Sequence, residues 1–295
     1  MIAKLGRRLN LRQIALASAE VYLTRFLLKV LLKEVNAYML VATCLYVACK
    51  MEEFPQHIRL VLSEARNLWP EYIPQDTTKL AEFEFYLVEE MELYLIIYHP
   101  YNSLLQIKNF LADNTSTYGV VLSDDDLQNS WSIINDSYIT DLHLLYPPHI
   151  IAIASLYITI VVRINLNESK KTQTINTTAE SMDGADGGSL DQMDSNMMHM
   201  EDLMMLANMN ASVSPVEVSR APDLFSAPSV DSGFSSSVKK DPNKIQGFMQ
   251  FLDHSHVNLD EVVDSIQEIV NLYILWNGYN ENIAKKALHN MIIYC

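Results

Sequence analysis

The stretch AYMLVATCLYVACKM, residues 37–51, decides the fold of this chain. Apart from Lys50 near its end, a helix drawn through it carries apolar or small residues on every side, and Asn36 stands before it as an N-cap. A helix without a polar face must be surrounded by other helices. The sequence therefore predicts a helical bundle built around residues 37–51.

Neighbouring segments supply the helices that this bundle needs. Residues 11–30 show apolar positions at helical spacing with charges elsewhere on the cylinder. Pro55 suits the first turn of a further helix through Asn67, which the pair Trp69-Pro70 ends. A fifth helix is predicted over residues 77–97, before His99-Pro100.

After Pro100 the same plan begins again. Helices are predicted over residues 101–112 and 124–145, the second opened by Ser123 with Asp126 three residues on, a capping-box pattern. Pro147-Pro148 opens another apolar helix, and setting its residues 149–159 under residues 38–48 aligns two Leu-Tyr pairs. This weak internal similarity favours two related bundles.

Residues 167–241 are rich in Ser, Asn, Asp, Gly and Met and have no sustained period, which predicts a disordered insertion. Helical patterns resume at residues 244–252, after the cap Asn258, and at 281–293. No segment alternates as a strand does, so the predicted class is all-α. The predicted domains are a first bundle, the first part of a second bundle, the insertion, and the remainder of the second bundle with a tail helix: residues 1–99, 100–166, 167–241 and 242–295.

Composition excludes several classes of function. Among 295 residues, 21 Lys and Arg face 36 Asp and Glu, and a net charge of −15 repels a phosphate backbone, so direct nucleic-acid binding is not expected. The most apolar run, residues 150–162, is too short to span a bilayer, and residues 1–12 do not form a signal peptide. Three cysteines, two of them in an apolar stretch, suit a reducing compartment, the nucleus or cytosol.

No catalytic constellation is present in the sequence. It has no phosphate-binding glycine loop, no His-Glu-x-x-His motif and no nucleophile elbow, which argues against an enzyme. His254 and His256 form an isolated His-x-His, read as a loop at a helix end, and Asp124–Asp126 suit the start of a helix. Neither a metal nor another cofactor is expected.

One segment carries a family resemblance. The sequence ACKMEE at residues 48–53 resembles the end of the third helix of a cyclin box. Further motifs narrow the resemblance to the cyclin C type of that family, the cyclin of the Mediator kinase module, in its fungal form: LGRRLN at 5–10, VYLTRF at 21–26, PQHIR at 55–59, LWPE at 68–71 and HPY at 99–101.

This resemblance implies tandem five-helix cyclin boxes and covers residues 1–165 and then residues from 241 onward. Relative to the family, the sequence lacks an amino-terminal helix and most of the first box helix, whose last part residues 3–9 resemble.

Cyclins grip a partner kinase with a lysine that ends the third helix and a glutamate in the fifth. By motif, the resemblance assigns these roles to Lys50 and Glu84, with Glu53 beside them. Arg7 and Arg8 could meet an acidic or phosphorylated element of the kinase. Outside this context, a lysine at a helix end simply favours the helix dipole, Glu84 would be a solvated residue, and the two arginines a basic edge.

The resemblance further implies a nuclear regulator of RNA polymerase II transcription, with a cyclin-dependent kinase and other Mediator kinase-module subunits as partners. In the second repeat the position of Lys50 is held by Val161, so only the first bundle should grip the kinase. Ser214-Pro215 has the form of a proline-directed phosphorylation site. Another transcriptional or cell-cycle cyclin, and a kinase-free cyclin-like scaffold, remain open alternatives.

Overall fold

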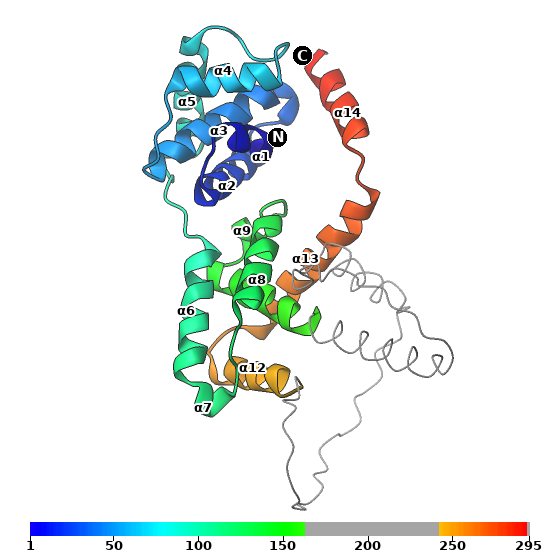
Figure 1. The fold of residues 1–295 in the computed structure, drawn as a ribbon. Coiled ribbons are helices and arrows are strands. Elements are labelled where there is room, and N and C mark those ends of the chain that lie inside the picture. Colours follow the sequence, from blue (N-terminus) through cyan, green and yellow to red (C-terminus); the bar gives the residue numbers. More distant parts are fainter. Residues whose placement is uncertain (163–241, 294–295) are drawn as a thin grey trace, which may run out of the picture.

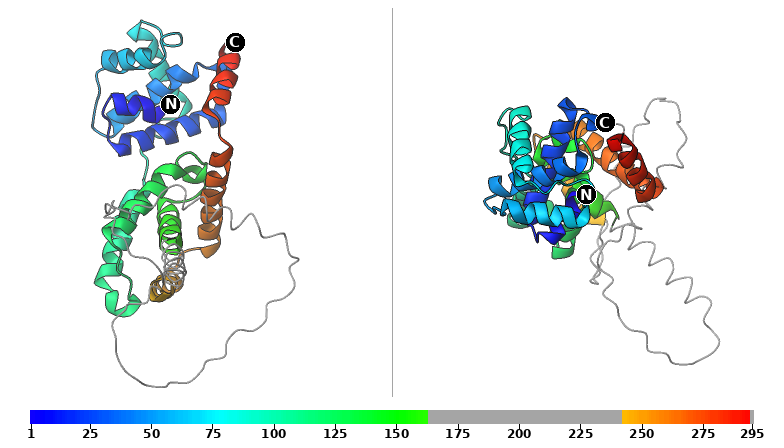
Figure 2. Two further views of the ribbon diagram at one scale, coloured as in Figure 1. Left: turned by 45° about the vertical axis from the view of Figure 1, so that its right-hand side comes forward. Right: turned by 90° about the horizontal axis from the view of Figure 1, so that it is seen from above.

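The computed structural model describes residues 1–162 and 242–293, all of whose regular elements are helices (Figure 1). They form two bundles, one above the other in this view, with the carboxyl-terminal helix rising beside the first (Figures 1 and 2). The all-α prediction is confirmed for the described part of the chain. The predicted insertion at residues 167–241, with Ser214, lies outside the described residues.

The first bundle contains five α-helices and one short 3-10 helix. In chain order they are α1 (Ile2–Arg8), α2 (Gln13–Lys29), η1 (Leu32–Glu34), α3 (Ala37–Met51), α4 (Ile58–Leu68) and α5 (Thr77–Glu90). As predicted, α3 is the central helix, and its bounds match the prediction. The Asn36 side chain accepts hydrogen bonds from the backbone N–H groups of Tyr38 and Met39 and so begins the helix.

The second bundle is built around a helix over residues 148–162, which is the predicted apolar helix after Pro147-Pro148. Around it lie α6 (Pro100–Asp113), α7 (Thr115–Tyr118), α8 (Asp124–Ser137), α9 (Leu142–Leu145), α12 (Pro242–His254) and α13 (Leu259–Gly278). The predicted capping box of Ser123 and Asp126 is present at the start of α8. Its core joins residues on both sides of the undescribed segment, such as Leu156 and Phe248.

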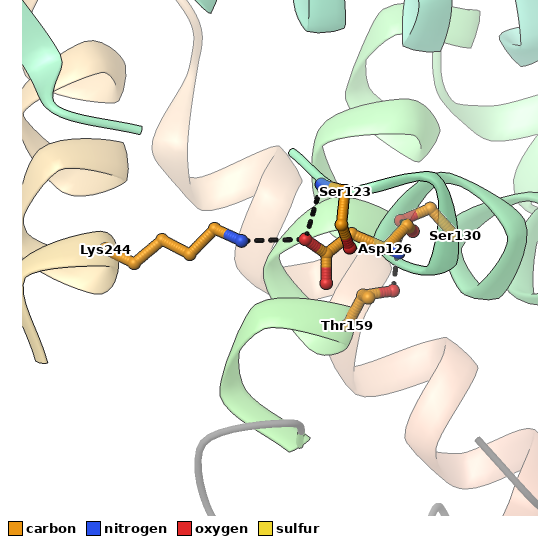
Figure 3. A network of polar contacts seen from close by, with 5 residues as sticks. All are labelled: Ser123, Asp126, Ser130, Thr159 and Lys244. Atoms are coloured by element: carbon orange, nitrogen blue, oxygen red, sulfur yellow. Dashed lines mark hydrogen bonds and ion pairs between the residues drawn. The ribbon is translucent and has the colours of Figure 1, made fainter. Parts of the chain in front are cut away.

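A buried polar network ties α12 to α8 in this bundle (Figure 3). The Nζ of Lys244 lies 2.7 Å from the carboxylate of Asp126, whose side chain is 1% exposed. The same carboxylate accepts the backbone N–H of Ser123, and Ser130 donates to Thr159 of the central helix. Asp126 therefore serves both as a helix cap and as an ion-pair partner.

The last helix, α14 (Glu281–Ile293), follows α13 of the second bundle and lies beside the first bundle (Figure 2). Glu281 pairs with Lys4 of α1, and His289 is hydrogen-bonded to the hydroxyl of Tyr72. Leu288 packs against the core of the first bundle. The tail helix predicted at residues 281–293 thus links the two bundles.

Three predicted helix boundaries were wrong. Helix α4 begins at Ile58 and not in a turn containing Pro55, because the ring of His57 caps it by accepting the Arg59 N–H. Helix α8 ends at Ser137, short of the predicted residue 145, and a break separates it from α9. The Thr140 hydroxyl accepts the Leu142 N–H in this break, so a side-chain turn replaces helical bonding.

The third error concerns α5, which ends at Glu90 and not at residue 97. Glu92 has a positive φ of 52°, the N–H of Leu93 donates to Val88, and that of Glu92 donates to Glu89. These bonds form a Schellman motif, which usually employs glycine at the left-handed position. The sequence carries no glycine here, which is why the boundary could not be predicted.

Candidate functional site

The end of α3 places Lys50 against Glu84 of α5. The Lys50 Nζ lies 2.6 Å from the Glu84 carboxylate, so the structure brings the two predicted site residues together. The side chains are 40% and 19% exposed, respectively, which puts the pair at the edge of the bundle and not in its core. Both charges remain accessible to an approaching partner.

The electrostatics of Lys50 favour its charged form. Partial burial by itself would lower the pKa of Lys50, but hydrogen bonds with Glu84 and Tyr46 outweigh it and the pKa is raised. The ammonium also lies 4.3 Å from the centre of the Tyr46 ring, a cation–π contact. Lys50 is therefore a fixed positive charge held by one carboxylate and one ring.

The backbone after Lys50 turns sharply at Glu53. Glu53 has a positive φ of 52°, and the N–H of Phe54 donates to the carbonyl of Cys49 at 2.9 Å. This is the Schellman arrangement again. The Glu53 side chain is exposed, three residues after Lys50 in the sequence. Within the described part of the chain, the Glu53 carboxylate forms no hydrogen bond or ion pair.

Large apolar side chains flank the pair without being covered. Phe85, next to Glu84 in α5, is 76% exposed, and Met51, next to Lys50, is 38% exposed. An apolar surface with a small number of oriented polar groups is what a protein-binding surface provides. The combination of Lys50, Glu84, Met51 and Phe85 is termed the α3–α5 edge below.

The two predicted arginines lie at a different helix end. Both are in the last turn of α1 and are exposed, and the Arg8 Nε lies 2.6 Å from the carboxylate of Glu64 in α4. The Arg8 side chain is thus partly committed within the first bundle. No contact joins them to Lys50 in the described residues.

The His-x-His at residues 254–256 and the acidic run at residues 124–126 both lie at helix ends, as the sequence predicts. His254 is the last residue of α12, and the acids at residues 124–126 occupy the first turn of α8. Within residues 1–162 and 242–293 no cluster of three metal-ligating side chains occurs. Among these residues no helix is both long and apolar enough to cross a membrane.

Comparison with known proteins gives consistent matches. The cyclin N-terminal domain family matches residues 1–96. An "RNA polymerase II holoenzyme cyclin-like subunit" of Scheffersomyces stipitis is 55% identical over 99% of this chain and 82% of its own length. The protein of the same name in Saccharomyces cerevisiae is 45% identical over 99% and 73%. The chain belongs to this family of cyclins.

Among solved structures, the cyclin resembles a chain of the yeast TFIIK (Kin28/Ccl1/Tfb3) complex. The TM-score is 0.46 and the identity 25%, over 53% of this chain and 67% of that one. The family assignment rests on the sequence relatives and not on this likeness.

Sequence reasoning missed one set of polar residues in this cyclin. Ser18, Glu52 and His99 meet where the two bundles touch, and Ser18 and His99 are buried. Ser18 stands among apolar residues of α2, and Glu52 is one of two adjacent glutamates at the end of the ACKMEE motif. The one available signal was a histidine directly before the proline that begins α6.

Proposed function

We propose that this cyclin is the regulatory subunit of a cyclin-dependent kinase of the Mediator complex and activates that kinase in RNA polymerase II transcription. The names of its relatives support the transcriptional role. The single observation that carries the kinase contact is the Lys50–Glu84 pair on the exposed α3–α5 edge. The cyclin contributes no catalytic atom to the reaction.

The chemistry of the edge suits a docked backbone. An ammonium and a carboxylate can hydrogen-bond to carbonyl and N–H groups of a partner, while Phe85 and Met51 supply apolar area. The partner element is the mobile αC helix of the kinase, which the first bundle pushes inward. The αC glutamate of the kinase then pairs with the lysine that grips ATP.

The expected effect is a shift in the population of kinase conformations. Moving a kinase from 1:99 to 99:1 in favour of the active form requires about 5.5 kcal/mol of preferential binding. An interface of roughly 1,200–2,000 Å² is the usual size for a specific protein complex. To bury an area of this size, the docking surface must extend from the α3–α5 edge over further parts of the first bundle.

The location and the other partners follow from the same proposal. The cyclin acts in the nucleus and meets further subunits of the Mediator kinase module. It acts without a cofactor and without direct contact to nucleic acid, in keeping with 21 basic residues against 36 acidic ones.

Affinity purification followed by mass spectrometry tests this function. The wild-type chain should recover a cyclin-dependent kinase together with Mediator subunits from a nuclear extract. Lys50→Glu should abolish kinase recovery because it places two carboxylates together at the edge. Its helical circular-dichroism signal should be unchanged.

Lys108→Glu is the matched control. Lys108 also pairs with a carboxylate, that of Asp124 at 3.0 Å, but it lies in the second bundle. This variant should recover the kinase normally. Undiminished kinase recovery with Lys50→Glu would reject the proposed role of the α3–α5 edge.

A further inference from the structure

The end of α3 is connected to the second bundle by a chain of hydrogen bonds. Tyr138, which follows α8, lies with its hydroxyl 2.6 Å from Nδ1 of His99. The other ring nitrogen of His99, Nε2, lies 2.8 Å from the hydroxyl of Ser18 in α2, and Ser18 lies 2.5 Å from the carboxylate of Glu52. Glu52 is the residue that caps α3.

The direction of every bond in this chain can be worked out. The Glu52 carboxylate only accepts, so Ser18 must donate its single proton to it. Ser18 can then only accept from His99, which places the His99 proton on Nε2. Burial lowers the pKa of His99 to about 4, so the ring holds one proton at neutral pH and Nδ1 accepts from Tyr138. All donors point from the second bundle toward Glu52.

Further contacts hold the residues of this hydrogen-bond series in place. The ring of His143 stacks on that of Tyr138 with centroids 3.6 Å apart, and Ser137 is hydrogen-bonded to His143 Nε2 at 2.9 Å. At the other end, the guanidinium of Arg12 lies 5.1 Å from the centre of the Phe54 ring, just after the turn at the end of α3. The turn is therefore held on both sides.

The series of hydrogen bonds ends at Glu52, which is two residues from Lys50 in the sequence. Glu52 belongs to the turn that terminates α3, and fixing its side chain fixes the direction in which the last helical turn presents Lys50. A fully satisfied buried polar chain specifies one geometry more narrowly than apolar contacts do. The second bundle thus helps to define a surface that belongs to the first.

We propose that Ser18, His99 and Tyr138 are positioning residues for kinase binding, which act by holding Glu52 and thereby orienting Lys50. This inference rests on the proposed function, because Lys50 must be the residue that grips the kinase. None of the three needs to touch the kinase. The second bundle, which carries Val161 in place of Lys50, contributes to binding through this chain.

A double-mutant cycle tests the proposal. The affinity of the purified cyclin for the kinase identified by the pull-down is measured for wild type, Ser18→Ala, Lys50→Ala and the double variant. Ser18→Ala should weaken binding about tenfold in the wild-type background, since it breaks two bonds of the chain. In the Lys50→Ala background the same change should weaken binding less than about twofold, because the residue it orients is gone.

The outcomes separate this inference from the proposed function. If Lys50→Ala does not weaken binding, both the role of Lys50 and the inference fail. If Lys50→Ala weakens binding but Ser18→Ala has no effect, or an equal effect in both backgrounds, only the inference fails. Ser155→Ala is the control, because Ser155 is another fully buried serine but donates to the carbonyl of Ala152 within its own helix.

A second variant covers the case in which Ser18→Ala does not fold. Tyr138→Phe removes only the hydroxyl at the start of the chain and keeps the ring that stacks on His143. It should weaken kinase binding about threefold with Lys50 present, and should leave the affinity of the Lys50→Ala variant unchanged. Equal weakening in both backgrounds would overturn the proposal.

Discussion

The central helices of the two bundles share a pattern of burial but differ at their ends. Leu45 and Leu156 are both fully buried, and the tyrosine that follows each is only partly buried. Five residues after the aligned leucine, α3 carries Lys50 and the helix over residues 148–162 carries Val161. The comparison teaches that the repeat preserves the packing of a core helix, while the lysine proposed to bind the kinase is present at the end of only one of the two helices.

Two of the lysine–carboxylate pairs, one from each bundle, show the same division. Lys50 and Glu84 meet at a partly exposed edge, whereas Asp126 of the second bundle is almost fully buried and is paired with Lys244. A buried carboxylate needs its partner for folding, because an uncompensated charge in the interior is costly. An exposed pair contributes little to stability and is available for binding.

The largest expected effect compares these two pairs. Lys244→Met should lower the free energy of unfolding by about 4 kcal/mol, because it removes the Lys244 cation from the buried Asp126 carboxylate. Lys50→Met should lower it by less than about 1 kcal/mol. Urea denaturation of both variants measures the difference, and equal losses would contradict the division between folding and binding pairs.

Adding Asp126→Asn to Lys244→Met gives the control. The amide oxygen can still accept the Ser123 N–H, and no charge remains buried. Part of the lost stability should therefore return.

A smaller effect concerns Glu20, whose carboxylate is mostly buried and forms no ion pair among the described residues. Burial raises the pKa of Glu20 to about 7; the charged amino terminus opposes this rise, and the charge of Asp136 adds to it. The folded state therefore holds a proton that the unfolded state has lost between about pH 4.5 and 7, and stability falls as the pH rises through that range. Asp126, by contrast, has a lysine partner.

Glu20→Gln should therefore stabilise the protein more at pH 8 than at pH 4.5, by about 2 kcal/mol. Urea denaturation at the two pH values measures this, and the wild-type chain under the same conditions corrects for every other titrating group. A stabilisation that is the same at both pH values would show that Glu20 is ionised at no cost.

The smallest effect tests how the two central helices begin. Helix α3 is capped by the Asn36 side chain, whereas the helix over residues 148–162 begins with Pro148, whose ring already fixes a helical φ. Asn36→Ala should lower the free energy of unfolding by about 1 kcal/mol, measured by thermal denaturation. Asn36→Asp keeps the acceptor and should cost less, although it loses the bond from the Asn36 amide to the Tyr72 carbonyl.

Local signals explain which elements could be predicted. Asn36, Ser123 and Asn258 each precede a helix, and each caps its helix as expected, because a cap needs only neighbouring residues. The ends of α5 and α8 have no glycine or proline signal, and their lengths were overestimated. There the chain turns through Glu92 in a strained conformation, or through a side-chain turn at Thr140.

The candidate site was predicted in part. The family motif at residues 48–53 indicated Lys50, and the resemblance indicated Glu84, which the structure places 2.6 Å away. Sequence reasoning gave no role to Ser18 or His99. They are 81 positions apart, and no pattern in the sequence relates two buried polar residues of different bundles.

By itself the sequence determined that the described part of this chain is built of helices, which helices are central, and which lysine stands at the end of the first central helix. These properties follow from periodicity, caps and motifs, all of which act over a few neighbouring residues. The tertiary structure alone decided that α14 reaches the first bundle and that Tyr138, His99 and Ser18 lead to Glu52. Hydrogen bonds between distant segments depend on how the helices pack in space, and packing geometry is not encoded in any local pattern.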